Sequence, residues 1–190
     1  QARDGILWRK DGTCIPTDEL RGSDNGLYMH IDLDRDVVGF RSRSSAPPLA
    51  LNAVEAYDPD DYWEPIRRPK DGRIDLEPDK FFLFATKERI RITNDICGEI
   101  MPYDASAGEF RSHYAGFFHS GFGGEKGTIG VLEIRGRESP HSLYDGQPIC
   151  LMIFEQLCSP VKTGYDGSYT DPRPSLSKFF QNRMTVWGAT

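Results

Sequence analysis

The stretch that decides the fold is residues 109–157, EFRSHYAGFFHSGFGGEKGTIGVLEIRGRESPHSLYDGQPICLMIFEQL. It predicts a small glycine-rich hairpin, then an apolar strand, then a return strand after a tight turn at Asp145-Gly146. The apolar strand carries one acid, Glu133. Burying a carboxylate without a partner is expensive, and the usual response is a shifted pKa. Glu133 is therefore the first candidate for chemistry.

Short apolar runs separated by turn residues extend over most of the 190-residue chain, which contains 19 glycines and 13 prolines. Residues 27–33 alternate apolar and polar side chains, which predicts a half-buried strand, and Val37–Arg43 is its expected hairpin partner. Such regularly spaced strands are typical of a sandwich or barrel, so we expect an all-β fold with little helix. Further strands are predicted at Gly5–Trp8, Leu49–Ala56, Phe81–Ala85 and Arg89–Ile92.

The chain divides into three parts in this interpretation. Residues 1–25 are a polar, loosely attached lead-in, residues 26–160 form the β domain, and residues 161–190 form a C-terminal arm rich in Tyr, Ser, Pro and Gly. Helix is expected only as one turn at Asp58–Asp61 and as a short segment at Leu176–Asn182.

Composition excludes several classes of function. A net charge of −6 and a pI near 5.2 argue against a protein that neutralises nucleic-acid phosphates. The four cysteines are far apart and include no Cys-x-x-Cys pair, which favours reduced thiols over disulfides or structural zinc. No apolar run is long enough to span a membrane, and the N-terminal residues do not resemble a signal peptide. We therefore expect a cytoplasmic protein with no nucleic-acid or membrane partner.

Three segments carry a resemblance to a known family. They are the strand FFLFATKERI at 81–90, the hairpin AGFFHSGFG at 115–123, and VLEI at 131–134 with the turn and strand that follow it. Together they resemble the dUTPase and dCTP deaminase superfamily, whose members have a dUTPase-like distorted β-barrel and usually assemble as trimers. The likeness is greatest to the second repeat of long, two-repeat bacterial dCTP deaminases, on the segments DYWEP at 61–65 and GEFRSHYAG at 108–116.

The resemblance implies hydrolytic deamination of dCTP to dUTP and ammonia in pyrimidine deoxynucleotide synthesis. The family's catalytic glutamate, which activates water, falls on Glu133, and the main chain that reads the base falls on Tyr114–Phe117. Mg²⁺ is expected on the triphosphate and zinc is not expected, since the zinc-deaminase signature is missing. The expected partners are a deoxynucleoside triphosphate and either further copies, as in a trimer, or a sister repeat. The predicted substrate-binding residues are Arg111, Tyr114, Ala115, Gly116, Phe117, Tyr165, Tyr169 and Lys178.

The chain departs from the family at the phosphate. The family's Ser-Ser-x-Gly-Arg loop falls on residues 102–106, PYDAS, so both serines and the arginine are missing at their usual positions and Asp104 would repel a phosphate. Arg111 or Lys178 are candidate substitutes. The alternative function is a catalytically degenerate repeat with a structural or nucleotide-binding regulatory role. An open pocket beside Glu133 favours the enzyme, whereas aromatic side chains or an arginine covering it favour the structural repeat.

Several single residues in the hairpin and the strand after it admit two interpretations. Glu133 is either the base or one half of a structural ion pair with Arg135 or Arg111. His119 stands where a dUTPase has its catalytic aspartate, which argues against a dUTPase and leaves a candidate base or an exposed turn residue. His119 is close in sequence to Arg111 and His113. The three residues form a site for a metal or an anion, or they belong to a solvated loop. Three aromatic residues of the hairpin either stack on a base or pack in the core: Phe117, Phe118 and Phe122.

Overall fold

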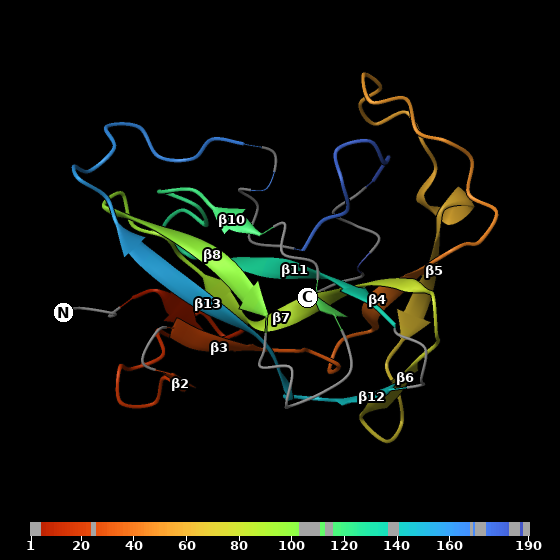
Figure 1. Cartoon of the computed structure of the whole chain (residues 1–190), viewed down its shortest axis with the longest axis horizontal. Helices are drawn as coiled ribbons and strands as arrows, with labels where there is room; N and C mark the ends of the chain where they lie inside the picture. Colours follow the sequence, from red (N-terminus) through yellow and green to blue (C-terminus); the bar gives the residue numbers. More distant parts are fainter. Residues whose placement is uncertain are drawn as a thin grey trace.

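The computed structural model describes residues 5–23, 26–102, 111–112, 116–136, 141–167, 169, 174–182 and 187. Within these residues the chain forms thirteen strands, arranged as two larger sheets packed face to face and a two-stranded ribbon at one end (Figure 1). The only helical element there is one 3₁₀ turn, η1 (Pro59–Asp61), at the position where the sequence predicts a helical turn. The predicted all-β fold with little helix is confirmed.

The six-stranded sheet has the order β5-β4-β7-β11-β9, and β1 also pairs with β7. Its central strand, β7, runs without a break through the strand predicted at 81–85 and into the one predicted at 89–92. Its ladder with β11 shifts register between Ile129 and Val131, opposite Thr86–Glu88. The strands are β1 (Leu7–Trp8), β4 (Val37–Ser42), β5 (Trp63–Arg67), β7 (Phe81–Ile90), β9 (Arg111–Ser112) and β11 (Thr128–Arg135).

The five-stranded sheet has the order β10-β8-β13-β3-β2, and β6 pairs with β12 in the separate ribbon. The turn at Asp145-Gly146 connects β12 to β13, as predicted. The strands are β2 (Gly22–Ser23), β3 (Gly26–His30), β8 (Ile96–Pro102), β10 (Phe117–Phe118), β13 (Pro148–Gln156), β6 (Arg73–Leu76) and β12 (His141–Tyr144).

The main core lies between the two larger sheets. Alternation along β3 and β7 directs Leu27, Met29, Phe82 and Phe84 inward, and all four are almost fully buried. Residues 5–8 contribute to this core as well: Ile6 and Leu7 are 4% and 3% exposed, and β1 pairs with β7. The expectation of a loose attachment is therefore wrong for this part of the lead-in, since the chain buries its apolar side chains there.

One predicted pairing and one predicted strand are wrong. β4 pairs with β5 and β7 rather than forming a hairpin with β3, because a buried ion pair, Asp32 with Arg35 at 2.6 Å, turns the chain from one sheet to the other. The segment predicted as a strand at 49–56 is a loop, in which Leu51 is 79% exposed. Its backbone bonds to the C-terminal segment instead, with the Glu55 N–H donating to the Lys178 carbonyl at 2.9 Å.

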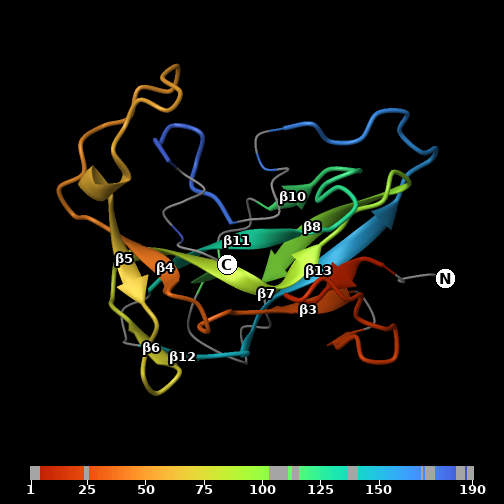
Figure 2. The same ribbon diagram turned by 180° about the vertical axis from the view of Figure 1, so that it is seen from behind.

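A second apolar cluster covers the outer face of the six-stranded sheet. There Phe40 and Leu83 pack against Tyr62, Leu176 and Phe180, so the end of the chain lies across the sheet rather than forming the helix predicted at 176–182. Figure 2 shows this segment, in blue, on the same side as the loop between β4 and β5, in orange. This covering creates a space between the sheet and the arm.

Two further sequence expectations can be compared with the described residues. Cys97 and Cys150 are buried free thiols, as the apolar runs around them predict, while Cys14 is partly exposed and Cys158 is exposed. No helix in the described part is both long and apolar enough to cross a bilayer.

Candidate active site

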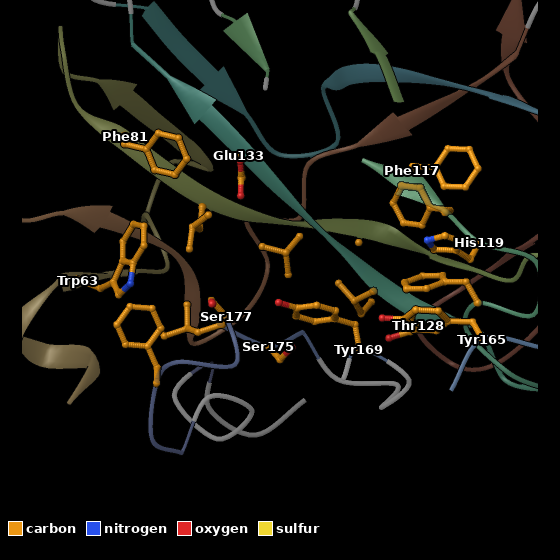
Figure 3. Close-up of a pocket in the computed structure, with 18 residues that line it drawn as sticks. Trp63, Phe81, Phe117, His119, Thr128, Glu133, Tyr165, Tyr169, Ser175 and Ser177 are labelled. Carbon is orange, nitrogen blue, oxygen red and sulfur yellow. The ribbon is translucent and has the colours of Figure 1, made fainter. Parts of the chain in front are cut away.

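A pocket of about 460 Å³ lies on the outer face of the six-stranded sheet, between the hairpin after β10 and the C-terminal arm. Figure 3 shows Glu133 between two aromatic groups, with Trp63 and Phe81 on one side and Phe117, His119 and Tyr165 on the other. The described residues that line it are Trp63, Phe81, Leu83, Phe117, Phe118, His119, Phe122, Thr128, Ile129, Gly130, Val131, Glu133, Tyr165, Tyr169, Ser175, Leu176, Ser177 and Phe180.

β11 forms the floor of the pocket and presents Glu133. Leu132 and Ile134 are 2% and 0% exposed in the main core, so the alternation of the strand directs Glu133 to the opposite face. Glu133 lies opposite Leu83 of β7 and is exposed, so the expectation that its carboxylate is buried is wrong. The reason is that the arm roofs this face at a distance and leaves the pocket open around the acid.

Glu133 forms no ion pair with another described residue. Arg135, two residues along the strand on the same face, is also exposed, and the two side chains are not paired. The structural pair with Arg135 is therefore not formed. A pair with Arg111 stays a prediction, because only the backbone of Arg111 is described, opposite Arg135 in the ladder with β9.

The hairpin supplies one wall through Phe117, which follows Gly116. The Gly116 carbonyl accepts a hydrogen bond from the Ile100 N–H at 2.9 Å, and a Cβ at residue 116 would lie only 2.7 Å from Ile100 Cδ1. Phe117 is 54% exposed at the pocket, whereas Phe118 and Phe122 meet edge to face at 4.9 Å in the core. Of the three phenylalanines, Phe117 is therefore the one available to a ligand ring.

His119 joins the hairpin to the C-terminal arm. Its ring stacks on Tyr165 at 5.8 Å with an interplanar angle of 6°, and it meets Phe117 edge-on at 5.0 Å. The arm segment 161–167, called the strap below, is docked by the Tyr165 N–H, which donates to the Ser120 carbonyl at 2.9 Å. His119 is thus the exposed turn residue that the sequence allows, and it also lines the pocket.

The opposite wall comes from β5, β7 and the end of the arm. The Trp63 ring lies 6.1 Å from Phe81 and 6.4 Å from Phe180. Phe180 is held by a parallel bridge to Tyr57 in the loop between β4 and β5. This wall brings together three distant parts of the chain, so Trp63 could not be predicted as a site residue from the sequence, although DYWEP was part of the resemblance. It also missed three hydroxyl groups at the pocket: Thr128, Ser175 and Ser177.

Comparison with known proteins agrees with this geometry. The sequence model described as "2'-deoxycytidine 5'-triphosphate deaminase (DCD), C-terminal domain" matches residues 7–180. The chain belongs to the dCTP deaminase family. It is similar in structure to the 2'-deoxycytidine 5'-triphosphate deaminase of Agrobacterium tumefaciens, with a TM-score of 0.68 and 30% identity over 76% of this chain and 45% of that one. The predicted dUTPase-like fold is confirmed by this likeness.

Two curated relatives are named "dCTP deaminase, dUMP-forming". The protein of Methanobrevibacter smithii is 25% identical over 111 residues, which are 55% of this chain and 54% of that protein. That of Methanosphaera stadtmanae is 25% identical over 136 residues, which are 67% of this chain and 68% of that protein. The chain therefore spans about half the length of the first of these relatives and of the A. tumefaciens enzyme.

The dCTP deaminase resemblance predicted site residues that the structure brings together only in part. Glu133, Phe117, Tyr165 and Tyr169 all line the pocket, with Gly116 next to Phe117. Lys178 does not line it, and its ammonium lies 5.7 Å from the centre of the Phe179 ring. The other two predicted residues of the hairpin, Tyr114 and Ala115, fall outside the described residues, as do His113 and residues 103–106.

The charges at the pocket of this dCTP deaminase family member are few. Among the described lining residues Glu133 is the only carboxylate, and no lysine or arginine is present. Within the described part of the chain no three His, Cys, Asp or Glu side chains gather as metal ligands. An apolar pocket with one acid suits an uncharged ring rather than a polyphosphate.

Proposed function

We propose that this chain deaminates dCTP to dUTP and ammonia, with Glu133 as the general base. The observation that carries the proposal is an exposed Glu133 carboxylate, free of ion pairs with the described residues, inside a pocket walled by Phe117 of the hairpin and by Tyr165 and Tyr169 of the arm. These groups come from separate parts of the sequence and line one pocket. Membership of the dCTP deaminase family supports the same reaction.

In the proposed reaction the Glu133 carboxylate takes a proton from water while the water oxygen attacks C4 of cytosine. Glu133 delivers this proton to N3 and then carries the proton of the new C4 hydroxyl to the amino group, so that the C4–N bond breaks and ammonia leaves as the C4 carbonyl forms. Phe117 packs against the base, and Tyr165 and Tyr169 close the arm over it. Mg²⁺ enters with the triphosphate as part of the substrate, zinc has no role, and further copies or a sister repeat complete the assembly.

A second candidate is the catalytically degenerate repeat. Two observations favour it: residues 102–106 do not have the family's two serines and arginine at their usual positions, and no cation is present among the described lining residues. In that case the pocket binds a nucleoside or nucleotide without turnover.

The experiment is an assay of dCTP turnover by the full chain and by Glu133→Gln, with Glu125→Gln as the matched control. Glu125 is an exposed glutamate at the hairpin tip and does not line the pocket. Loss of a positioned general base lowers rates by about 10²–10⁴-fold, so ammonia release should disappear in Glu133→Gln only. Separation of the nucleotides distinguishes dUTP from dUMP as the product.

The outcomes separate the two candidates. Turnover that survives in Glu133→Gln would refute Glu133 as the base. Absence of turnover in all three proteins, each folded by circular dichroism, would refute the enzyme and leave the degenerate repeat.

A further inference from the structure

The ladder between β7 and β11 shifts register once, between Ile129 and Val131. Ile129 lies opposite Arg89, whereas Val131 lies opposite Ala85. Three residues of β7, Thr86–Glu88, therefore face a single residue of β11. Compared with an unbroken ladder, the shift displaces the start of β11 by two residues along β7, or about 7 Å.

The register shift separates two parts of the pocket. On one side of it, the end of β11 pairs with the start of β7 and presents Glu133. On the other side, the hairpin is bound to the residues that follow β7, since the Gly121 N–H donates to the Ile92 carbonyl at 2.9 Å. This hairpin carries the pocket wall that includes Phe117 and His119 (Figure 3). The geometry of the shift therefore fixes where that wall lies relative to the acid.

Thr86 lies at the register shift and is fully buried. Its hydroxyl accepts a hydrogen bond from the Gly130 N–H at 2.9 Å and donates one to the Glu88 carbonyl at 2.7 Å. One side chain thus holds the surplus residues of β7 and the single residue of β11 that faces them. A Cβ at residue 130 would lie 3.2 Å from Thr86 Cγ2 and 3.3 Å from Thr86 Oγ1, so this close contact favours glycine there. We call Thr86 and Gly130 the joint.

The β7 side of the joint is also bound to the other sheet. Thr86 forms an antiparallel bridge with Ile31, the residue that follows β3. The Glu88 carboxylate accepts a hydrogen bond from the His30 N–H at 3.0 Å and lies 2.6 Å from Nδ1 of the His30 ring. Since both sheets fix this part of β7, the Thr86 hydroxyl links β11 to a well-anchored position.

We propose that Thr86 is a positioning residue, which sets the distance between Glu133 and the hairpin wall. The inference rests on the proposed function, because a base packed against Phe117 has to place its C4 atom next to the Glu133 carboxylate. β-Bulges are frequent beside active sites, where they redirect side chains. Thr86 does not line the pocket, so it acts only through the strand that it holds. A misplacement of about 1 Å between reacting groups costs about 10²-fold in rate.

The first test separates activity from stability with two substitutions of Thr86 in the full chain. Thr86→Val keeps the size of the side chain and removes the acceptor of the Gly130 N–H. Thr86→Ser keeps the hydroxyl and deletes a fully buried methyl group, which lowers the Tm instead. At a temperature where every variant is folded, kcat for dCTP should fall about 10²-fold in Thr86→Val and stay near the wild-type value in Thr86→Ser.

Thr93→Val is the matched control, because it removes a hydroxyl that donates to the Asp95 carboxylate at 2.6 Å and does not line the pocket. It should leave kcat unchanged. Values of kcat that follow the Tm across the three variants would overturn the positioning role, since a purely structural residue would give that result.

Amide hydrogen exchange, measured by mass spectrometry, provides a second readout that needs no turnover. The segment 128–131 contains the Gly130 amide and should exchange faster in Thr86→Val than in Thr86→Ser or Thr93→Val. Equal exchange in all three variants would show that the Thr86 hydroxyl does not hold β11, and would overturn the inference.

Failure of the proposed function gives a different result from failure of this inference. If Glu133→Gln abolishes turnover but Thr86→Val and Thr86→Ser have equal kcat, the deaminase proposal stands and the positioning role of Thr86 fails. If the wild-type chain binds dCTP without releasing ammonia, the deaminase proposal fails, and Thr86→Val should still be the one Thr86 variant with weakened dCTP affinity. A wild-type chain that neither binds nor converts dCTP would overturn both.

Discussion

Replacement of Gly121 by alanine should release the strap from the hairpin. Gly121 has φ +85°, and a Cβ there would lie 2.5 Å from Gly164 Cα and 2.7 Å from the Tyr165 nitrogen. The added methyl group and the strap cannot occupy the same space. Gly124 is the matched control, because it also has a positive φ, +55°, but its Cβ would meet nothing within 4 Å.

The two substitutions share one cost and differ in another. Each places an alanine in the left-handed region, which costs about 1–2 kcal/mol. Gly121→Ala also displaces Tyr165, losing its backbone hydrogen bond to Ser120, about 1 kcal/mol, and its ring contacts with His119 and Phe122, about 0.5–1.5 kcal/mol. The additional loss of about 2 kcal/mol corresponds to a Tm about 4–8 °C below that of Gly124→Ala.

Thermal unfolding and limited trypsin digestion provide the assay. Lys162 is exposed within the strap, so release of the strap should speed cleavage after Lys162 in Gly121→Ala but not in Gly124→Ala. Equal Tm values and equal cleavage rates for the two variants would refute the contact between the strap and Gly121, and with it the placement of Tyr165 in the pocket wall.

Three further predictions concern the turn between β12 and β13, the core and the arm. Burial alone would raise the pKa of Asp145, but hydrogen bonds, the first from Lys87 Nζ at 2.7 Å, hold the pKa below its ordinary value. The stability that the Asp145 carboxylate adds is therefore present above about pH 4 and is lost as the pH falls through the folded pKa. Asp145→Asn should lower the free energy of unfolding, measured in urea, by about 1 kcal/mol at pH 7 and by less at pH 3. An equal loss at the two pH values would contradict this. Burial raises the pKa of Cys150 to about 12, so iodoacetamide at pH 8 should label exposed Cys158 in the native protein and Cys150 only in urea, as judged by mass spectrometry. The Phe180 side chain is 3% exposed, so Phe180→Ala should destabilise the arm by up to about 3–5 kcal/mol and weaken dCTP binding. Phe179→Ala, at a half-exposed side chain, is the control, and equal dCTP affinity of the two variants would contradict a role of Phe180 in the wall.

Patterns local to one strand were predictable from the sequence. The apolar alternation of residues 27–33 correctly predicts β3, and the position of Glu133 between Leu132 and Ile134 correctly places it in a strand. The periodicity of two also separates the faces of β11, because successive side chains point to opposite sides of a sheet whatever lies beyond it. The hairpin and the tyrosines of the arm were recognisable by resemblance, since their motifs are contiguous.

What lies over each face was not predictable, because it depends on segments distant in the chain. The sequence suggests a buried Glu133, yet the arm roofs that face and leaves the acid open to the pocket. The sequence likewise predicts that β4 pairs with β3, its neighbour in the chain. In the structure β4 pairs with β7 of the other sheet, and the buried ion pair of Asp32 and Arg35 lies in the connection between β3 and β4.

By itself the sequence determined an all-β chain of the dCTP deaminase family and a strand that carries a single acid. Only the tertiary structure decided that this acid faces an open pocket and that Trp63 forms one of its walls. Strand periodicity is a local property of the backbone, whereas the choice of neighbours is made by burying the apolar faces of the whole chain at once.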